Sequence, residues 1–430
     1  MGGPEIQTAE ALEAHQLERL RELIAELVGH NAFYGPRLAA AGLTADVPSL
    51  DDFAARMPFT TKPELAADQQ ADPPYGTNLT APLESYTRVH QTSSTTGSPL
   101  RWPDTERNWS WMIDGWLQVF AAAGLGPADR VFLAFSFGPF IAAWLAFDAA
   151  ERMGCLAIPG GGLSSEQRAH AIHDHHATAM VCTPTYAVRL GEVARAEGLD
   201  LAGAGLRTII VGGEPGASVP AFRRRVEELW PGVRLDDHHG MTETGAVTFQ
   251  CPERAGVLHA LEDLFLCEVV DPESGAPVSP DHDEPGELVL TTLGRFDSPV
   301  LRYRTRDLVR ARRGPCACGR NGLRFEGGIL ARTDDMIVVR GVNLFPTAVD
   351  EVVRGFDRVA EYRVEVDQSG ALTEIRVVVE PHNNDQPIEP LCRELEHAFR
   401  SAWNLRIPVV AAAPGELPRF ELKAKRWVRV

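Results

Sequence analysis

The stretch from Val131 to Gly161, VFLAFSFGPFIAAWLAFDAAERMGCLAIPGG, decides the fold expectation for this chain. It begins with a short apolar run, continues into a longer segment with helical periodicity, and closes with a second short apolar run. The same alternation continues through AMVCT and RTIIVGG, with helical segments between them. Short apolar strands that alternate with helices form parallel sheets covered by helices. The sequence therefore predicts an α/β fold.

Three further regions surround this α/β unit. Apolar residues at helical spacing between Leu12 and Val28 predict an amphipathic packing helix that ends near Gly29. After about Leu264, runs such as FLCEVV and ELVLTTL, separated by turn residues, predict a β-rich subdomain. Past Arg332 the pattern predicts a small α+β unit. We place the boundary near Asp334, which gives a large N-terminal domain of residues 1–333 and a small C-terminal domain of residues 334–430.

Composition and charge exclude several classes of partner. The chain has 430 residues, more than one hydrophobic core usually supports, with 42 basic and 59 acidic residues and a formal charge of -17. This charge disfavours nucleic acid and anionic membranes as partners. The apolar stretch from Val131 to Phe147 is interrupted by Gly138 and Pro139 and is too short to span a bilayer. Because the seven cysteines are odd in number and no secretion signal is evident, we expect a cytoplasmic protein with reduced thiols or a metal site.

A hydroxyl-rich segment is the first motif that suggests chemistry. Residues Thr92 to Pro99, TSSTTGSP, suit a loop that offers hydroxyl and backbone N–H donors to phosphate oxygens. The alternative is a plain surface loop, which such clusters usually form. The P-loop pattern GxxxxGK[ST] is absent, so ordinary kinase or GTPase phosphate binding is not supported.

Five further motifs follow in order along the chain. They are GGEPG (212–216), HHGMTETG (238–245), YRTRD (303–307), RTDDMIVVRGVNLFP (332–346) and ELKAKR (421–426), with FYGPRLAAAGL (33–43) and PFTTKPEL (58–65) ahead of them. Together these motifs resemble the adenylate-forming superfamily and, within it, the phenylacetate-CoA ligase family. The resemblance implies ATP-dependent activation of a small acid as an acyl-adenylate, then transfer to coenzyme A with release of AMP and pyrophosphate. It also implies a mobile small domain and favours a homodimer.

The resemblance assigns a nucleotide site residue by residue. Glu243 would hold the magnesium ion, with Thr242 beside it in the catalytic turn, and a carboxylate suits that hard cation. Asp307 would accept hydrogen bonds from the ribose hydroxyls, the alternative being an ion pair with a neighbouring arginine. The remaining nucleotide and coenzyme A contacts implied are Thr92, Ser93, Ser94, Thr95, Thr96, Gly97, Gly213, Glu214, Pro215, His238, His239, Gly240, Met241, Arg332, Gly341 and Asn343.

His239 stands where the family carries an aromatic residue that stacks on adenine. A metal pair formed by His238 and His239 with Asp236 and Asp237 is the alternative. Adjacent histidines in a strand point to opposite faces, which disfavours that pair.

Lys423 is the catalytic lysine that the resemblance implies, and Lys425 is the nearby alternative. Its ammonium group would neutralise charge between the carboxylate and the α-phosphate when the small domain closes. The small domain would then rotate about Asp334 and present the face with Gly341 and Asn343 for the second half-reaction. The chain departs from the family at several glycine positions, which are occupied by Ser94, Arg306, Ala331 and Leu422.

A structural zinc site is expected in the β-rich region. Cys316 and Cys318 lie in the turn PCACGR, which looks like the cysteine-rich turn of some family members. Cys251 and His259 would complete a tetrahedral set. The alternative is that the cysteines are free thiols, because the spacing is not that of a standard zinc finger.

The acid pocket is expected beside Gly212, where the parallel strands end. Phe137, Gly138, Phe140 and Trp144 form an aromatic-rich stretch near the family's substrate-lining segment. The alternative is that these rings are core residues. This stretch and the resemblance both favour an aromatic acid.

Two other functions remain open from the sequence. The first is capture of the adenylate by another acceptor, such as a carrier-protein thiol or an amine, because RGVN favours coenzyme A only weakly. A non-catalytic relative that binds a nucleotide or an acid is the second, since a fold does not fix a function. Glu243, Asp307 and Lys423 together count against it.

Overall fold

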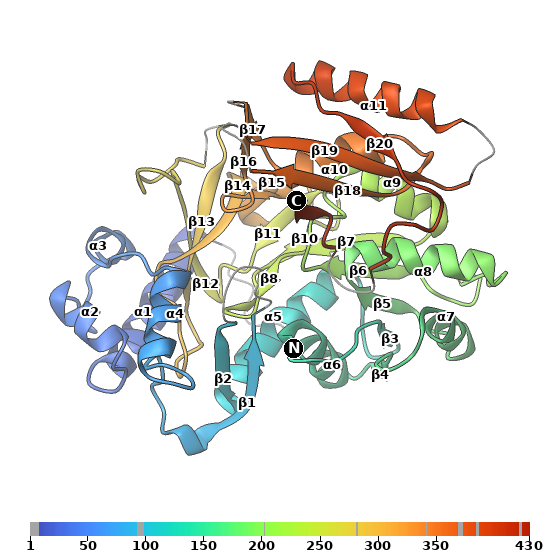
Figure 1. Cartoon of the computed structure of the whole chain (residues 1–430). Helices are drawn as coiled ribbons and strands as arrows, with labels where there is room; N and C mark the ends of the chain where they lie inside the picture. Colours follow the sequence, from blue (N-terminus) through green and yellow to red (C-terminus); the bar gives the residue numbers. More distant parts are fainter. Residues whose placement is uncertain are drawn as a thin grey trace.

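The computed structural model describes residues 8–92, 99–201, 203–280, 283–340, 342–368, 373–383, 387–420 and 424–430. Figure 1 shows a helical N-terminal region, a central α/β unit, a β-rich unit between them, and a small C-terminal unit that lies across the α/β unit. The predicted α/β fold with a β-rich subdomain and a small α+β unit is confirmed.

Four helices form the N-terminal region: α1 (Ala9–Leu27), α2 (Tyr34–Ala40), α3 (Leu50–Arg56) and α4 (Lys62–Ala71). The hydroxyl of Thr8 caps α1 by accepting a hydrogen bond from the Ala11 N–H. The predicted amphipathic face is buried, with Leu20, Leu23 and Leu27 fully enclosed. This face packs with residues of the β-rich unit, so the N-terminal helices do not form a separate core.

A hairpin leads from this region into the α/β unit. Strand β1 (Tyr86–Gln91), which follows the short 3-10 turn η1 (Leu83–Ser85), pairs antiparallel with β2 (Arg101–Thr105), and β2 runs directly into α5 (Glu106–Ala122). The hairpin therefore brings Thr92 and Leu100, which follow β1 and precede β2, close together.

The parallel sheet has the strand order β4 (Leu156–Pro159), β3 (Arg130–Leu133), β5 (Ala179–Cys182), β6 (Thr208–Gly212) and β7 (Arg234–His238). Its neighbours pair in parallel throughout. The connecting helices are α6 (Ile141–Met153), α7 (Ser165–Asp174), α8 (Pro184–Ala196) and α9 (Pro220–Leu229). Alternate residues of β3 enter two different cores: Val131 packs with α5 and α6, and Phe132 packs with α7 and α8. Helices therefore cover both faces of the sheet.

The β-rich unit is a six-stranded antiparallel sheet. Its order is β10 (Thr248–Gln250), β11 (Val257–Ala260), β15 (Asn321–Arg332), β14 (Tyr303–Pro315), β13 (Gly286–Thr292) and β12 (Phe265–Val270). The small hairpin of β8 (Gly240–Met241) and β9 (Gly245–Ala246) joins it to the α/β unit. Strands β14 and β15 are long, and β15 ends at Arg332, where the chain passes into the C-terminal unit.

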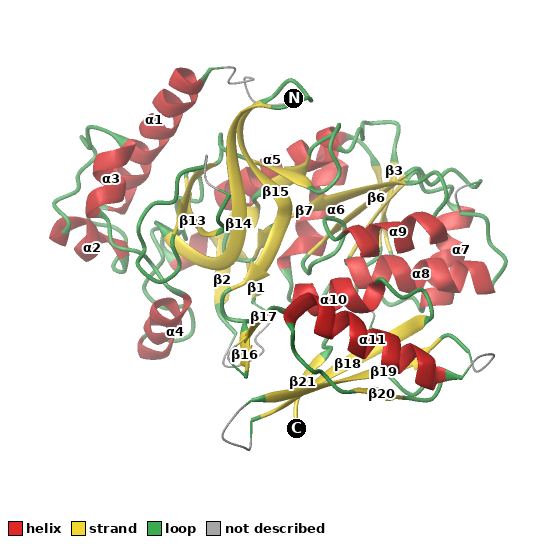
Figure 2. Cartoon of the chain, turned by 90° about the horizontal axis from the view of Figure 1, so that it is seen from above, coloured by secondary structure: helices red, strands yellow, loops and turns green. Residues whose placement is uncertain are grey.

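The C-terminal unit has its own core. After the hairpin of β16 (Ile337–Val339) and β17 (Val342–Leu344) come α10 (Pro346–Arg354), β18 (Val359–Asp367), β19 (Glu374–Pro381), α11 (Ile388–Trp403), β20 (Val409–Ala411) and β21 (Trp427–Arg429). The sheet order is β20, β19, β18, β21. Apolar residues of α11, such as Leu395 and Phe399, pack on this sheet. In Figure 2 the sheet and α11 form a layer beside the α/β unit.

No helix in the described part of the chain is long and apolar enough to cross a membrane.

Candidate active site and metal centre

Asp307 is the centre of a buried charged cluster. It lies on β14 with 2% of its surface exposed. Its Oδ1 accepts a hydrogen bond from Arg332 Nη1 at 3.1 Å, and its Oδ2 lies 3.1 Å from His239 Nε2. Burial alone would raise the pKa of this carboxyl, but His239 and Arg332 outweigh it and hold the pKa below the ordinary value. Asp307 is therefore an ionised acceptor.

The ion pair that was the alternative for Asp307 is not formed with its sequence neighbours. Arg304 instead pairs with Glu287 and donates to the Pro272 carbonyl. Arg306 adopts a φ of 70°, in the left-handed region that favours glycine. This explains physically why the related family uses glycine there. The Oδ2 of Asp307 and the Nε2 of His239 are buried and face each other, without an aligned hydrogen bond to any described residue.

Arg332 joins this cluster to the start of the C-terminal unit. Besides Asp307, its guanidinium donates to both carboxylate oxygens of Asp334, at 3.0 Å and 2.9 Å. Burial lowers the pKa of Arg332, but Asp307 and Asp334 raise it by more, so the guanidinium stays charged. The residue predicted as the hinge is thus bonded to the same side chain as the residue predicted to bind ribose.

The turn between β8 and β9 carries Thr242 and Glu243. Gly240 is required at its base, because an added Cβ would lie 2.6 Å from the Gly245 carbonyl oxygen. Glu243 is 4% exposed, and its Oε1 accepts a hydrogen bond from the Tyr303 hydroxyl at 3.2 Å. Lys62 Nζ lies 3.9 Å from the same oxygen. The carboxylate therefore has a cation and a donor beside it.

A fully buried ion pair holds this turn from behind. Arg295 and Asp104 have no exposed surface, and Arg295 donates to both oxygens of Asp104. Arg295 Nη1 also donates to the carbonyl oxygens of Thr242 at 2.9 Å and Glu243 at 2.5 Å. Its guanidinium stacks over Trp102. The backbone of the turn is thus fixed by a charge that cannot reach water.

The ends of the predicted phosphate loop are tied together. The Thr92 N–H donates to the Leu100 carbonyl at 3.0 Å, and the Leu100 N–H donates to the Thr92 hydroxyl at 3.0 Å. Ser93, Ser94, Thr95, Thr96 and Gly97 lie outside the described residues. The described part therefore fixes only the base of this loop.

The turn after β6 places Gly212, Gly213, Glu214 and Pro215 at the end of the parallel sheet. An added Cβ on Gly212 would lie 2.6 Å from His238 Nε2, so the imidazole covers this glycine. Both carboxylate oxygens of Glu214 accept backbone N–H groups, from Thr185 at 2.8 Å and from Ala424 at 2.9 Å. The Glu214 side chain thus bonds to protein, in addition to any contact that its backbone makes with a nucleotide.

The two adjacent histidines point to different surroundings, as predicted. His238 contacts the edge of Trp116, with ring centroids 4.5 Å apart, while His239 faces Asp307. Burial lowers the pKa of His238 to about 4, so its imidazole is neutral. Asp236 instead pairs with Arg234, and Asp237 accepts from the Ser218 hydroxyl, so the described residues place no metal pair here.

The aromatic stretch predicted to line the acid pocket lies at the N-terminus of α6. Phe137 has a φ of 49° and contacts Trp144 edge-on. Trp144 Nε1 donates to the Gly138 carbonyl at 2.9 Å. Phe140 and Trp144 are 38% and 40% exposed, so the two rings are not core residues. Their role toward an acid stays a prediction.

Two residues assigned to the small domain's chemistry, Lys423 and Gly341, lie outside the described residues. Asn343 lies exposed on β17, opposite Val338 of β16. Met241 packs partly against the N-terminal core.

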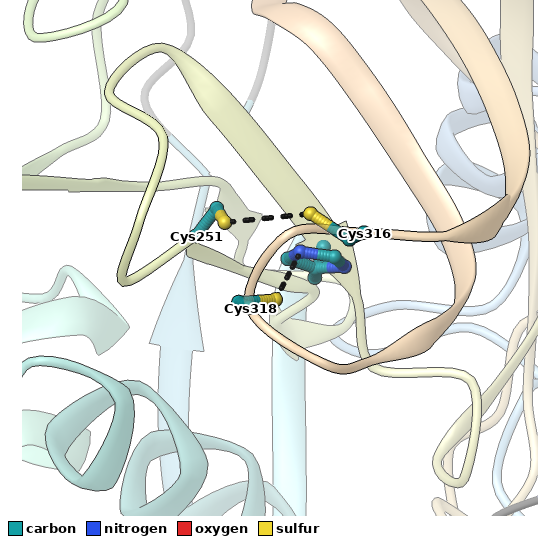
Figure 3. Close-up of side chains that lie close together, drawn as sticks. Cys251, Cys316 and Cys318 are labelled. Carbon is teal, nitrogen blue, oxygen red and sulfur yellow. Dashed lines mark hydrogen bonds between the residues drawn. The ribbon is translucent and has the colours of Figure 1, made fainter.

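The four predicted zinc ligands converge. Cys251, His259, Cys316 and Cys318 place their ligand atoms within 4.8 Å of one another. The sulfurs of Cys251 and Cys316 are 3.7 Å apart, and Cys318 Sγ is 3.4 Å from His259 Nε2. Figure 3 shows the three cysteine side chains directed toward one another. His259 stacks on Phe249, which orients its ring.

Sequence reasoning missed two residues beside Glu243. Tyr303 is in the motif YRTRD, and residues of β14 alternate between buried and partly buried. This period of two places Tyr303 on the same face as Asp307, so the motif contained the signal. Lys62 is in the motif PFTTKPEL, at the first position of α4. Its position beside Glu243 depends on a contact between segments 181 residues apart, so it needed the structure.

Comparisons with known proteins agree with this geometry. The family model for AMP-binding enzymes matches residues 48–295, and that for the AMP-binding enzyme C-terminal domain matches residues 341–429. The phenylacetate-coenzyme A ligase of Escherichia coli is 32% identical over 98% of this chain and 95% of its own length. That of Thermus thermophilus is 34% identical over 97% of this chain and 96% of its own length. The chain belongs to the phenylacetate-CoA ligase family of adenylate-forming enzymes.

The chain is also similar to a solved 2-hydroxyisobutyryl-CoA ligase, and the similarity differs between two states of that relative. In the postadenylation state, with 2-HIB-AMP, that relative is 28% identical and superposes with a TM-score of 0.92, over 99% of this chain and 91% of its own. In the thioesterification state, with coenzyme A, the TM-score is 0.74 over the same shares of both chains. This chain is therefore more similar to the postadenylation state of that relative than to its thioesterification state.

Proposed function

We propose that this protein is an AMP-forming acid–CoA ligase. In the first step a carboxylate oxygen attacks the α-phosphate of ATP, which forms an acyl-adenylate and releases pyrophosphate. In the second step the thiol of coenzyme A attacks the acyl carbon, and AMP leaves. The observation that carries this proposal is the convergence of His239, Asp307 and Arg332, with Glu243 bonded to Tyr303 of the strand that carries Asp307, in a chain related along nearly its whole length to phenylacetate-CoA ligases.

The first step requires alignment and charge neutralisation more than proton transfer, because a carboxylic acid is already ionised near neutral pH. Asp307 is an ionised, buried acceptor suited to the ribose hydroxyls. Glu243 would hold a magnesium ion, which when bound neutralises phosphate charge. Lys423, as the family resemblance implies, would supply the cation between the carboxylate and the α-phosphate.

Coenzyme A is the acceptor that the relatives favour. The curated relatives are named as coenzyme A ligases, and the solved relative was captured with coenzyme A. Gly341 and Asn343 would face the thiol after the small domain rotates. A carrier-protein thiol or an amine is the alternative, and activity with free coenzyme A separates them.

An aromatic acid is the favoured substrate. The names of the curated relatives specify phenylacetate, and Phe137, Phe140 and Trp144 supply rings near the end of β3. The solved relative is named for a branched aliphatic acid, so the test must include both classes.

A structural zinc ion fits the cysteine and histidine cluster. Zinc bonds of about 2.3 Å to sulfur and about 2.0 Å to nitrogen, at tetrahedral angles, put two sulfurs about 3.8 Å apart and sulfur and nitrogen about 3.5 Å apart. The separations of 3.7 Å and 3.4 Å match these values. Cys251, Cys316, Cys318 and His259 would hold the ion with no position left for a substrate, so its contribution would be to stability.

A cytoplasmic location and a homodimer complete the proposal. The described cysteines are all free, and zinc thiolates and free thiols persist in a reducing compartment. The dimer follows from the family resemblance, and the mass of the purified protein in solution, measured by light scattering, tests it.

The function is tested by acid-dependent exchange of labelled pyrophosphate into ATP. The panel contains benzoic, phenylacetic, cinnamic and short aliphatic acids, with wild type and Lys423→Ala, and Lys425→Ala is the matched control. We expect exchange with an aryl acid, its collapse in Lys423→Ala, and retention in Lys425→Ala. Free coenzyme A is then added, and acyl-CoA is measured directly. Absence of exchange with every acid would contradict the proposal.

A further inference from the structure

Glu214 connects three parts of the chain that are far apart in sequence. It lies in the turn after β6, in the large domain. One carboxylate oxygen accepts the N–H of Thr185, at the start of α8, at 2.8 Å. The other accepts the N–H of Ala424, which belongs to the C-terminal unit, at 2.9 Å. The carboxylate therefore bridges the α/β unit and the C-terminal unit with both of its oxygens.

The α8 side of this bridge is anchored. Thr185 is in the first turn of α8, where backbone N–H groups have no partner within the helix and the helix dipole favours an anion. The preceding residue, Pro184, has no N–H, and Thr183 caps the helix through its hydroxyl. Glu214 therefore has a fixed position before it meets the C-terminal unit.

The tail side of the bridge is equally well defined. Arg426, two residues after Ala424, makes two hydrogen bonds with Glu361 on β18, at 2.7 Å and 3.1 Å. Arg426 Nη1 also reaches the Thr185 hydroxyl at 3.5 Å. Burial lowers the pKa of Arg426, but the carboxylate of Glu361 and its other partners raise it by more, so the charge is retained. The tail is thus attached to its own sheet and to the start of α8.

Ala424 directly follows Lys423, the residue proposed to enter the active site. Consecutive Cα atoms are about 3.8 Å apart, so the bond to Ala424 fixes the backbone beside the lysine. This arrangement of the domains resembles the postadenylation state of the solved relative, and its coenzyme A-bound thioesterification state resembles this chain less. A rotation of the small domain moves residue 424 relative to residue 214.

We infer that Glu214 is a positioning residue for the adenylation half-reaction, and that its carboxylate latches the C-terminal unit onto the α/β unit by accepting the Ala424 N–H. The inference rests on the proposed function. The latch is present in the described arrangement, which resembles the postadenylation state of the relative, and must open before the thiol attack. Glu214 therefore favours one half-reaction over the other, which a residue that merely stabilises the fold does not do.

The test measures the two half-reactions separately. Adenylation is followed by acid-dependent pyrophosphate exchange, and thioester formation is followed in a single turnover from a synthetic acyl-adenylate and coenzyme A. The Glu214→Gln variant has the same shape, but one oxygen is replaced by an amide donor that faces an N–H. Hydrogen bonds to charged groups typically contribute enough for a tenfold to hundredfold change in rate. We expect the ratio of adenylation to thioester formation to fall by about tenfold or more.

A second variant isolates the tail bond from the α8 bond. Ala424→Pro removes the N–H donor and also restricts the backbone of the preceding residue, whereas Ala424→Ser keeps the donor and is the control for a changed side chain. We expect Ala424→Pro to lower the same ratio and Ala424→Ser to leave it within about twofold. Because Glu214 and Ala424 form one bond, the ratio in the double variant Glu214→Gln with Ala424→Pro should fall by less than the product of the two single effects. Glu197→Gln is the control for the loss of a carboxylate. Glu197 lies just after α8, where it is an exposed partner of His170.

The outcomes separate this inference from the proposed function. Suppose that the wild type catalyses exchange, and that the Glu214 and Ala424 variants lower both half-reactions equally or change neither. This result would overturn the latch and leave the function intact. Absence of wild-type exchange with every acid would overturn the function, and the latch with it.

Discussion

The buried pair of Arg295 and Asp104 gives the sharpest prediction of stability. Neither side chain has exposed surface, and the guanidinium makes three hydrogen bonds to the carboxylate, at 3.0 Å, 2.7 Å and 2.9 Å. Replacing Arg295 by methionine keeps most of the volume but leaves the charge of Asp104 without its cation. Breaking a buried pair in this way costs roughly 3–5 kcal/mol. At about 1.4 °C per kcal/mol for a domain of roughly 330 residues, we expect the midpoint of thermal unfolding to fall by roughly 4–7 °C.

A double variant separates stability from activity. Asp104→Leu combined with Arg295→Met removes both charges, and a buried pair replaced by apolar residues is often neutral in stability. We therefore expect the double variant to recover most of the lost midpoint. It should not recover pyrophosphate exchange, because the carbonyl oxygens of Thr242 and Glu243 still lack the donor that holds their turn.

Differential scanning fluorimetry and pyrophosphate exchange on the same preparations provide the two readouts. Arg152→Met is the matched control, because Arg152 pairs with Asp114 at the surface, where both side chains are nearly half exposed. Such a pair contributes at most about 1 kcal/mol. A midpoint change below about 2 °C in Arg295→Met, or a double variant no more stable than the single one, would refute the reasoning.

Three further predictions follow from the site. Cys316→Ser should lower the zinc content from about one ion per chain to well below that, and should lower the unfolding midpoint. The metal is measured by mass spectrometry after dialysis, and metal-free wild-type protein purified without chelators would contradict this. Asp307→Asn should weaken ATP binding by about tenfold to a hundredfold in calorimetry. Because the pKa of Asp307 is held below its ordinary value, the charge is lost only in acid, so wild-type affinity should show no step from Asp307 between about pH 5 and pH 8, and a step there would count against the assignment. Arg306→Gly should raise the free energy of unfolding by roughly 0.5–1 kcal/mol, because a left-handed backbone is strained for arginine and open to glycine; a loss of stability in urea denaturation would show that the arginine side chain contributes more than the strain costs.

Much of the α/β unit was predictable from local pattern. The runs AMVCT and RTIIVGG became β5 and β6, because short apolar segments between helical ones can be buried only as strands with both faces covered. The convergence of Cys251, His259, Cys316 and Cys318 was also predicted, from the ligand chemistry of thiols and an imidazole and from the resemblance of the turn PCACGR to the family.

Contacts across long sequence separations were not predictable from local pattern. The bond from Ala424 to Glu214 spans 210 residues, and neither residue has a local property that announces it. Glu214 is predicted to contact the nucleotide, which stays a prediction, and the two backbone N–H groups that its carboxylate accepts were not predicted. The identity of Asp307's partner was equally non-local, because Arg332 lies on the neighbouring strand β15, whereas Arg304, three residues from Asp307 in sequence, pairs with Glu287.

The N-terminal helices also have a consequence for biosynthesis. Thr60, just before α4, donates its hydroxyl to the Leu301 carbonyl, and its backbone forms a bridge with Tyr303. The 241 residues between Thr60 and Leu301 take roughly 10–50 s to synthesise at about 5–20 residues per second. During that interval the apolar faces of the first helices have emerged from the ribosome, while the segment from Leu293 to Tyr303 that packs on them has not been made. The nascent chain therefore displays an early apolar surface to chaperones until this segment, which leads into the strand that carries Asp307, is synthesised.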